Sequence, residues 1–175
     1  MSAKIFSVLC LLVAVCCIYA VSAASSEYDD TYYDKKTKAV SQKVAGTESA
    51  NPLKLVSFNG GDCQCSNLAC SCCTGVRVKK LKFDKEVCAV IEYLKQEIGV
   101  GASIKVNQKQ LLSTSVSVSN PPPVCLTVPD FPAVQLCLRF HDLQISGGKL
   151  HACADLETRV TKLPVLALHF KCITV

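Results

Sequence analysis

The sequence lacks the residue patterns that hydrolytic enzymes carry. Its 175 residues contain no G-x-S-x-G motif of a serine nucleophile and no H-E-x-x-H motif of a zinc protease. Histidine is scarce, with three in the chain. The alternation of polar and apolar residues predicts that His151 and His169 lie on exposed strand faces, and His141 stands at an expected bend. We therefore predict no catalytic residue, no metal, no cofactor and no enzymatic activity.

The sequence also lacks a second long apolar segment. Residues 1–23 combine Lys4 with an uncharged apolar run at 5–20 and small residues before the expected cleavage after Ala23, which is typical of a signal peptide. This run is shorter than the roughly 18 residues of a membrane span, although an uncleaved anchor is the alternative. The C-terminal residues 163–175 are apolar but contain charged side chains, so they make a poor lipid-anchor signal.

Two further absences bear on the compartment. The chain has no N-x-[ST] acceptor for N-glycosylation and no C-terminal retention tetrapeptide. Together with the signal peptide, these absences predict a secreted, extracellular protein that carries no N-linked glycan and no stable membrane anchor.

Cysteine, in contrast, is abundant. Three of the 13 cysteines lie in residues 1–23, which leaves an even number, ten, in the mature chain. An even count in an oxidising compartment predicts disulfides, with no thiol to spare for a nucleophile. The ten are Cys63, Cys65, Cys70, Cys72, Cys73, Cys88, Cys125, Cys137, Cys153 and Cys172.

The spacing of the cysteines restricts the pairing without fixing it. Adjacent Cα atoms lie about 3.8 Å apart, below the usual disulfide minimum of about 4.4 Å, so Cys72 and Cys73 are expected to bond elsewhere. The two C-x-C pairs are likewise poor partners for themselves. Five cysteines crowd into residues 63–73 and five are spread through the rest, so we expect some bonds to join the cluster to the body.

A thiolate metal cluster is the alternative interpretation of the crowded cysteines. Closely spaced thiolates are ligands that zinc and copper(I) prefer. The segment 63–73 lacks the C-x2-C pairs of structural zinc sites, and secretion disfavours free thiols. We therefore predict disulfides.

Residues 24–57 are polar and short of core residues. An acidic, tyrosine-bearing patch at 27–34 is followed by the basic residues Lys35-Lys36-Thr37-Lys38. This composition predicts a disordered arm or propeptide. Tyrosines beside carboxylates are candidates for sulfation and Lys35-Lys36 for processing, and a solvated linker is the alternative. Residues 58–175 then form one cysteine-rich β domain.

Period-two alternation dominates this domain and predicts half-buried strands. The alternating segments are 100–106, 112–118, 134–140, 150–160 and 166–172. Gly147-Gly148 fits a hairpin turn, whereas 120–123 and 129–132 contain prolines and are expected to break the sheet at a long connection. Residues 87–98 fit both strand and helix spacing.

These elements predict an all-β fold. We expect a disulfide-stapled antiparallel β-sandwich of about seven strands, with an N-terminal cysteine-rich knot and a disordered N-terminal arm.

The combined motifs resemble one known family. The C-x-C-x4-C-x-C-C cluster is followed by Asn120-Pro121-Pro122-Pro123-Val124-Cys125, Leu136-Cys137-Leu138-Arg139-Phe140, Ala152-Cys153 and a final Cys172. This pattern is similar to DUF4773, an arthropod secreted cysteine-rich family of unknown function, over residues 63–172. The resemblance implies a secreted module without assigned activity, so it supplies no functional residues.

The segment 76–83 is the best candidate for a charged binding face. A β-bulge near its centre would direct four cations outward, namely Arg77, Lys79, Lys80 and Lys82. Such a stripe suits sulfated glycans, acidic proteins or anionic lipid heads, and a solvated edge strand that discourages aggregation is the alternative. Removing Lys4 with the signal lowers the formal net charge from +5 to +4, which disfavours nucleic acid as a partner.

The sequence leaves three classes of function. The first is a secreted, non-enzymatic module with a binding or structural role toward an extracellular macromolecule. The alternative is an extracellular carrier whose sheets enclose a small apolar ligand. A toxin-like or inhibitory effector on a stapled scaffold comes third.

Overall fold

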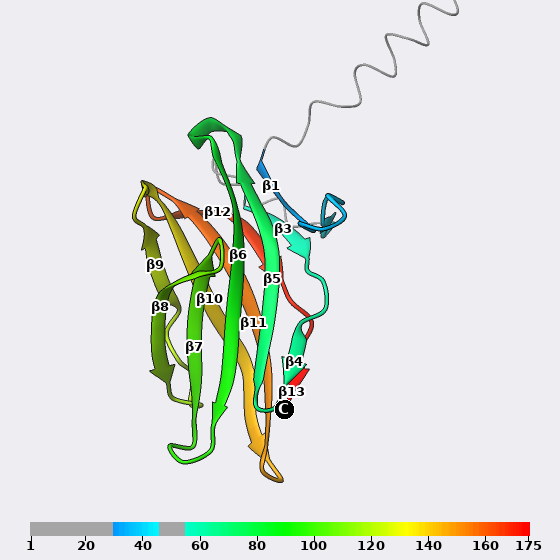
Figure 1. The fold of residues 1–175 in the computed structure, drawn as a ribbon, viewed down its shortest axis with the longest axis vertical. Helices are drawn as coiled ribbons and strands as arrows, with labels where there is room; N and C mark the ends of the chain where they lie inside the picture. Colours follow the sequence, from blue (N-terminus) through cyan, green and yellow to red (C-terminus); the bar gives the residue numbers. More distant parts are fainter. Residues whose placement is uncertain (1–29, 46–54) are drawn as a thin grey trace, which may run out of the picture.

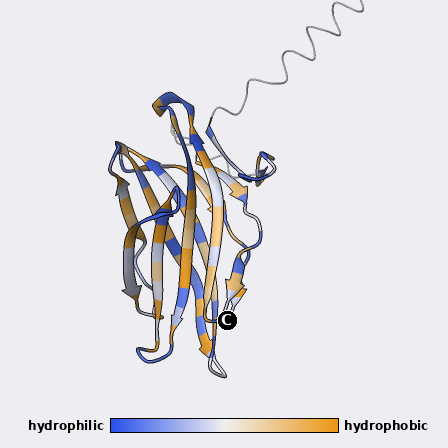
Figure 2. Ribbon diagram, viewed as in Figure 1, coloured by the Kyte–Doolittle hydropathy of each residue, from blue (hydrophilic) through white to orange (hydrophobic). Residues whose placement is uncertain are grey.

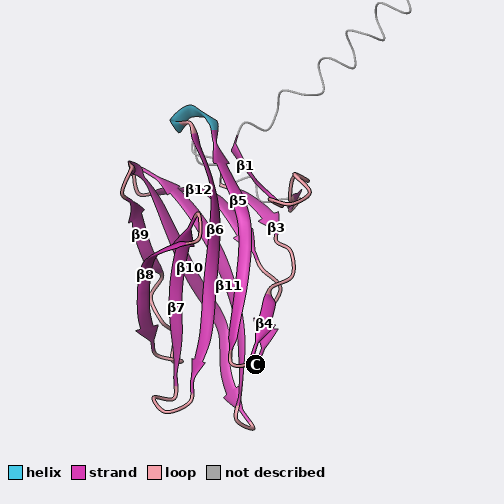
Figure 3. Ribbon diagram, in the orientation of Figure 1, coloured by secondary structure: helices cyan, strands magenta, loops and turns pink. Residues whose placement is uncertain are grey.

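The structure is a computed structural model that describes residues 30–45 and 55–175. Within these ranges the chain forms two β-sheets with a single short helical turn (Figures 1 and 3). The predicted signal peptide at 1–23 lies outside the described residues. The two sheets and the five disulfides of the described residues confirm the predicted all-β, disulfide-stapled fold.

The first sheet has six strands in the order β1-β5-β6-β7-β8, with β4 also paired to β5. All its pairings are antiparallel. The strands are β1 (Asp30–Tyr33), β4 (Gln64–Ser66), β5 (Ala69–Val78), β6 (Phe83–Leu94), β7 (Gly99–Val106) and β8 (Lys109–Val116).

The second sheet has seven strands in the order β2-β3-β12-β11-β10-β9, with β13 paired to β11. The β3–β12 pair is parallel and the other pairs are antiparallel. The strands are β2 (Gln42–Lys43), β3 (Val56–Asn59), β9 (Val124–Val128), β10 (Phe131–Ser146), β11 (Lys149–Val160), β12 (Leu163–His169) and β13 (Ile173–Thr174). The estimate of about seven strands was too low, because the arm and the cysteine cluster form strands as well.

The core lies between the two sheets and follows the alternation of the strands (Figure 2). On β11, Leu150, Ala152, Ala154 and Leu156 face inward and are buried, while the residues between them face outward. Across the core, Phe83 packs edge-to-face on Phe131 with ring centroids 5.2 Å apart. The alternate residues, whose side chains point away from the core, are therefore mainly polar residues and disulfide-bonded cysteines.

The ambiguous segment 87–98 is a strand up to Leu94 and a turn beyond it. The segment is a strand because β6 lies between β5 and β7 and forms antiparallel ladders with both. Its apolar residues then alternate inward, as in Val87 and Ile91, which are buried. The segment also fits helical spacing because it contains so many apolar residues that some of them fall three or four positions apart.

The expectation of a disordered arm at 24–57 is wrong for its described part. Strand β1 pairs with β5, and the Tyr32 side chain is 0% exposed. The Tyr32 hydroxyl donates to the Leu156 carbonyl at 2.9 Å and lies 2.8 Å from Thr158 Oγ1, while its ring packs edge-to-face on Phe58. Composition missed this segment because one anchored aromatic side chain, rather than an apolar run, holds it.

The same contacts bear on tyrosine sulfation. Tyr32 and Tyr33 are both buried in the folded protein, and their hydroxyls hydrogen-bond to the Leu156 carbonyl and to Asp84, so both groups are engaged within the fold. Tyr28 lies outside the described residues. Lys35 and Lys36, the expected processing site, lie in an exposed turn that follows β1.

The two proline segments differ from the expectation in one respect. Residues 120–123 do separate β8 in the first sheet from β9 in the second. Pro129 and Asp130, however, form a tight turn between β9 and β10, and Pro132 lies inside β10. The β9–β10 register shifts between Phe131 and Gln135, so Pro132 falls where the ladder is interrupted and its missing N–H is tolerated.

Candidate binding sites at the basic end and on the outer sheet face

The ten cysteines in the described part of the chain are all joined in disulfides. The pairs are Cys63–Cys72, Cys65–Cys70, Cys73–Cys88, Cys125–Cys137 and Cys153–Cys172. As expected, neither the adjacent cysteines nor the C-x-C pairs bond to themselves. The predicted bond between cluster and body is Cys73–Cys88, across β5 and β6. Because all these sulfurs are paired, the thiolate metal cluster is not formed.

The cysteine cluster is not a separate knot, which corrects the expectation. Strand β4 pairs with the start of β5, so Cys65 lies opposite Cys70 in a hairpin of the first sheet. The C-x-C spacing makes this possible, because residues two apart on a strand point to the same face. Cys70 and Cys72 are accordingly both buried.

The basic segment 76–83 forms a hairpin turn rather than a bulged strand. Strand β5 ends at Val78, residues 79–81 make one 3₁₀ turn, and Lys82 has a φ of 51° before β6 begins. The Lys82 amide donates to the Lys79 carbonyl at 2.9 Å, which closes the turn. Since β5 lies between β1 and β6, the solvated edge strand is also wrong.

The four predicted cations are nevertheless exposed, as expected. They differ in how they are held. The Arg77 guanidinium lies 3.1 Å from Asp84 Oδ2 and stacks over the Tyr33 ring. Lys80 and Lys82 form no ion pair with any described residue, so their charges are available to an external anion.

We call the end of the sandwich that carries these four cations the basic end. Lysines that the sequence did not single out extend it. Lys85 and Lys109 line a depression of about 350 Å³ between the β7–β8 turn and the β9–β10 turn. The Lys85 ammonium lies 5.9 Å from the Phe131 ring centre. Charge counting along the chain missed them because the hairpin turns of two different sheets meet at this end only after folding (Figure 1).

Tyr33 supports the basic end from beside it. Its hydroxyl hydrogen-bonds to Asp84, and its ring covers Gly75 on the paired strand. Burial, and then the neighbouring Asp84 carboxylate, raises the pKa of Tyr33. The hydrogen bond from Tyr33, helped by the Arg77 guanidinium, lowers the pKa of Asp84.

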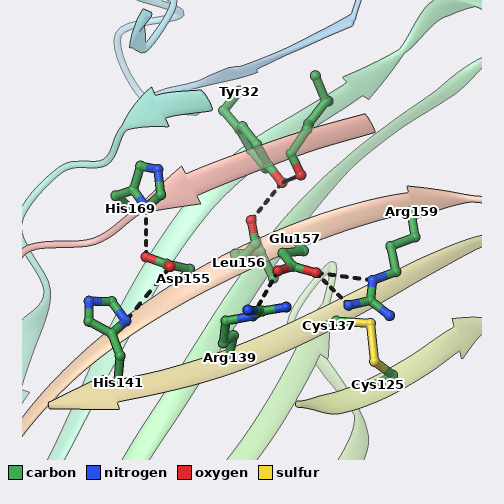
Figure 4. A network of polar contacts seen from close by, with 11 residues as sticks. Tyr32, Cys125, Cys137, Arg139, His141, Asp155, Leu156, Glu157, Arg159 and His169 are labelled. Atoms are coloured by element: carbon green, nitrogen blue, oxygen red, sulfur yellow. Dashed lines mark hydrogen bonds and ion pairs between the residues drawn. A yellow bond between two sulfur atoms is a disulfide. The ribbon is translucent and has the colours of Figure 1, made fainter. Parts of the chain in front are cut away.

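A second polar cluster occupies the outer face of the second sheet (Figure 4). Asp155 on β11 lies between two histidines from the flanking strands. Its Oδ1 is 2.8 Å from Nδ1 of His169 on β12, and its Oδ2 is 3.7 Å from Nδ1 of His141 on β10. Asp155 is 14% exposed, whereas the His169 and His141 side chains are 42% and 51% exposed. The carboxylate is thus fixed beneath two accessible imidazoles.

Two residues along β11, Glu157 is held in the same way by two arginines (Figure 4). Its Oε1 lies 2.9 Å from Nε of Arg139, and its Oε2 lies 2.6 Å from an amino group of Arg159. The cluster thus places each carboxylate of β11 between basic side chains: two imidazoles flank Asp155, and two guanidinium groups flank Glu157.

The third histidine is placed apart from this cluster. His151 contacts Asp142 at 3.4 Å and Thr174 at 3.1 Å. The prediction that His151 and His169 lie on the polar phase of their strands is confirmed, since both face outward. The outward alternation of β11 could have identified Asp155 and Glu157 as well, but not their partners on other strands.

The fold and its cysteines define a disulfide-stapled β protein of two sheets. The chain belongs to the DUF4773 family, described as a domain of unknown function, whose signature matches residues 62–175. The family expected from the motifs is thereby confirmed. No curated protein and no solved structure matches the chain.

Two observations concern its environment. Five disulfides fit an oxidising compartment. Among the described residues, no helix combines the length and the apolar character needed to cross a membrane.

Proposed function

We propose that this protein is a secreted, non-enzymatic binding module that engages a sulfated glycan through its basic end. The observation that carries the proposal is that lysines of the β5–β6 turn and of strands β6 and β8 gather at one end of the first sheet. Lys80 and Lys82 project from the β5–β6 turn, while Lys85 and Lys109 line the neighbouring depression. Flexible ammonium groups on a stapled frame suit a polyanion whose charges are spaced along a chain.

The filled interior supports a module over a carrier. The inward side chains of both sheets pack on one another, and Tyr32 is inserted between the sheets against Phe58. A ligand between the sheets would have to displace these buried aromatic rings. The outer surface is therefore the better candidate for binding.

The proposal is tested by heparin affinity chromatography of the mature protein in a salt gradient. The double variant K80Q/K82Q is expected to elute at lower salt than the wild type, because two cations are lost at the basic end. The control is K95Q/K149Q, which removes the same charge from exposed lysines at the opposite end of the sandwich. Equal shifts for both variants, or no retention of the wild type, would contradict the proposal.

Secretion is tested separately by intact mass after expression in eukaryotic cells. The protein in the medium is expected to lack residues 1–23 and all ten cysteine thiol hydrogens. Retention in cells with residues 1–23 still attached would contradict secretion and leave the glycan test unaffected.

A further inference from the structure

We propose that the outer face of the second sheet holds a divalent transition-metal site, with His141, Asp155 and His169 as ligands. This site is distinct from the basic end, because it lies on the other sheet and uses no lysine. Imidazole nitrogen and carboxylate oxygen together are a donor set for Zn²⁺ and Cu²⁺.

The first argument is that two histidines flank one carboxylate. The chain has three histidines, and two of them direct Nδ1 at the two oxygens of one carboxylate. The three residues lie on neighbouring strands. Asp155 is directly opposite His169 on β12 and Arg139 on β10, and His141 lies two residues beyond Arg139 on the same face of β10. Figure 4 shows Asp155 between the two rings.

The second argument is that the frame under these donors is rigid. Asp155 follows Cys153 by two residues, and His169 precedes Cys172 by three, so one disulfide braces both positions. His141 is directly opposite Cys153 in the β10–β11 ladder. Donors on a stapled sheet lose little conformational freedom when an ion binds.

The third argument is that the rings are free to adjust. A zinc ion needs nitrogen and oxygen donors at about 2.0–2.2 Å. Both imidazoles are more than two-fifths exposed, so they can turn about their side-chain bonds toward an ion on Asp155 without disturbing the core. His169 also borders an open depression of about 630 Å³ on its other side, so its ring is not enclosed by neighbouring side chains.

The test is an NMR titration of the mature protein, prepared without a polyhistidine tag, with ZnCl₂. The imidazole signals of His141 and His169 are expected to shift together and saturate at one zinc per chain, while His151 stays in place. No ring shift at equimolar zinc, or a shift confined to His151, would overturn the proposal.

Substitutions then assign the ligands by competition against a chromophoric zinc chelator. His169→Ala, His141→Ala and Asp155→Asn are each expected to weaken zinc binding by at least about tenfold, the scale on which even supporting residues act. His151→Ala is the matched control and is expected to leave the affinity unchanged. Equal weakening in the control would overturn the assignment.

Folding is controlled in the same samples. His141→Ala changes a half-exposed side chain, so its melting temperature without zinc should match the wild type. In the wild type, zinc should raise the melting temperature, and in His141→Ala the increase should be lost. An equal increase in both proteins would contradict the proposal.

Discussion

Tyr32 and Tyr33 are neighbours, yet their side chains lie on opposite faces of β1. Tyr32 enters the core, whereas Tyr33 covers Gly75 on the outer face of the first sheet. Glycine is required there by close approach rather than by backbone conformation, because a ring occupies the space of a side chain. Tyr32 therefore anchors the N-terminal arm in the core, while Tyr33 holds the Asp84 carboxylate that pairs with Arg77.

Substitution of Gly75 by alanine tests this contact. An added Cβ would lie 2.3 Å from Cζ of Tyr33, so the ring must move and its bond to Asp84 is strained. We expect a loss of about 1–3 kcal/mol in the free energy of unfolding, measured with guanidinium. Gly61→Ala is the control, since nothing lies within 4 Å of its Cβ position. Similar losses in both variants would show that the Tyr33 contact is unimportant.

The pKa shifts at this contact predict the pH dependence of stability. The pKa of Asp84 is lowered from 3.8, so its contribution is present above that pH and is lost as pH falls through the folded value. The pKa of Tyr33 is raised from 10.0, so its contribution is present below that pH and is lost as pH rises through the folded value.

Asp84→Asn should therefore destabilise the protein at neutral pH, and the difference from the wild type should shrink below pH 3.8. Unfolding free energies measured across that range check this. A difference that stays constant with pH would mean that the charge of Asp84 plays no part.

At the scale of elements, the N-terminal strand is the least expected part of the fold. It has four residues, but Tyr32 reaches across to the second sheet through Leu156 and Thr158. Strand β1 lies at the edge of the first sheet, and through Tyr32 it also binds the second sheet.

Truncation tests the role of this strand. A chain that begins at Lys35 is expected to lose about 3–5 kcal/mol of stability, because it leaves the site of a buried aromatic ring empty. A chain that begins at Glu27 keeps β1 and should match the full mature protein. Thermal and guanidinium unfolding compare them, and equal stability of the two would favour the original view of the arm as a removable propeptide.

The sequence predicted the elements better than their arrangement. Alternation located β7, β8, β10, β11 and β12, because polar residues alternate with apolar ones along each of them, even in β8, where no side chain is fully buried. It could not place Asp155 beside His141 and His169, since those contacts join three strands. The sequence pattern also could not show that the chain turns at Lys79–Lys82. Lys82 has a positive φ, which is unusual for lysine, and the segment contains none of the residues that are typical of turns.

At the scale of the whole molecule, each disulfide lies within one sheet. Three bonds are in the first sheet and two are in the second. Within residues 30–45 and 55–175, the two sheets are held together by the apolar core, by Tyr32 and by the connecting chain, and no disulfide joins one sheet to the other.

This arrangement predicts one cooperative unfolding transition for the oxidised protein. Each sheet has an apolar face that needs the other sheet to cover it, so neither is expected to remain folded alone. Far-ultraviolet circular dichroism and tyrosine fluorescence should follow the same guanidinium curve. Two separated transitions would show that the disulfides make each sheet an independent unit.

The disulfides also have a simple order along the chain. The bonded cysteines are between 5 and 19 residues apart, and Cys65–Cys70 is nested inside Cys63–Cys72 while the other bonds follow one after another. No bond interleaves with another. As the chain enters the oxidising compartment from its N-terminal end, each cysteine except Cys63 can therefore find its partner before the next pair arrives, and Cys63 has to wait only for the nested pair.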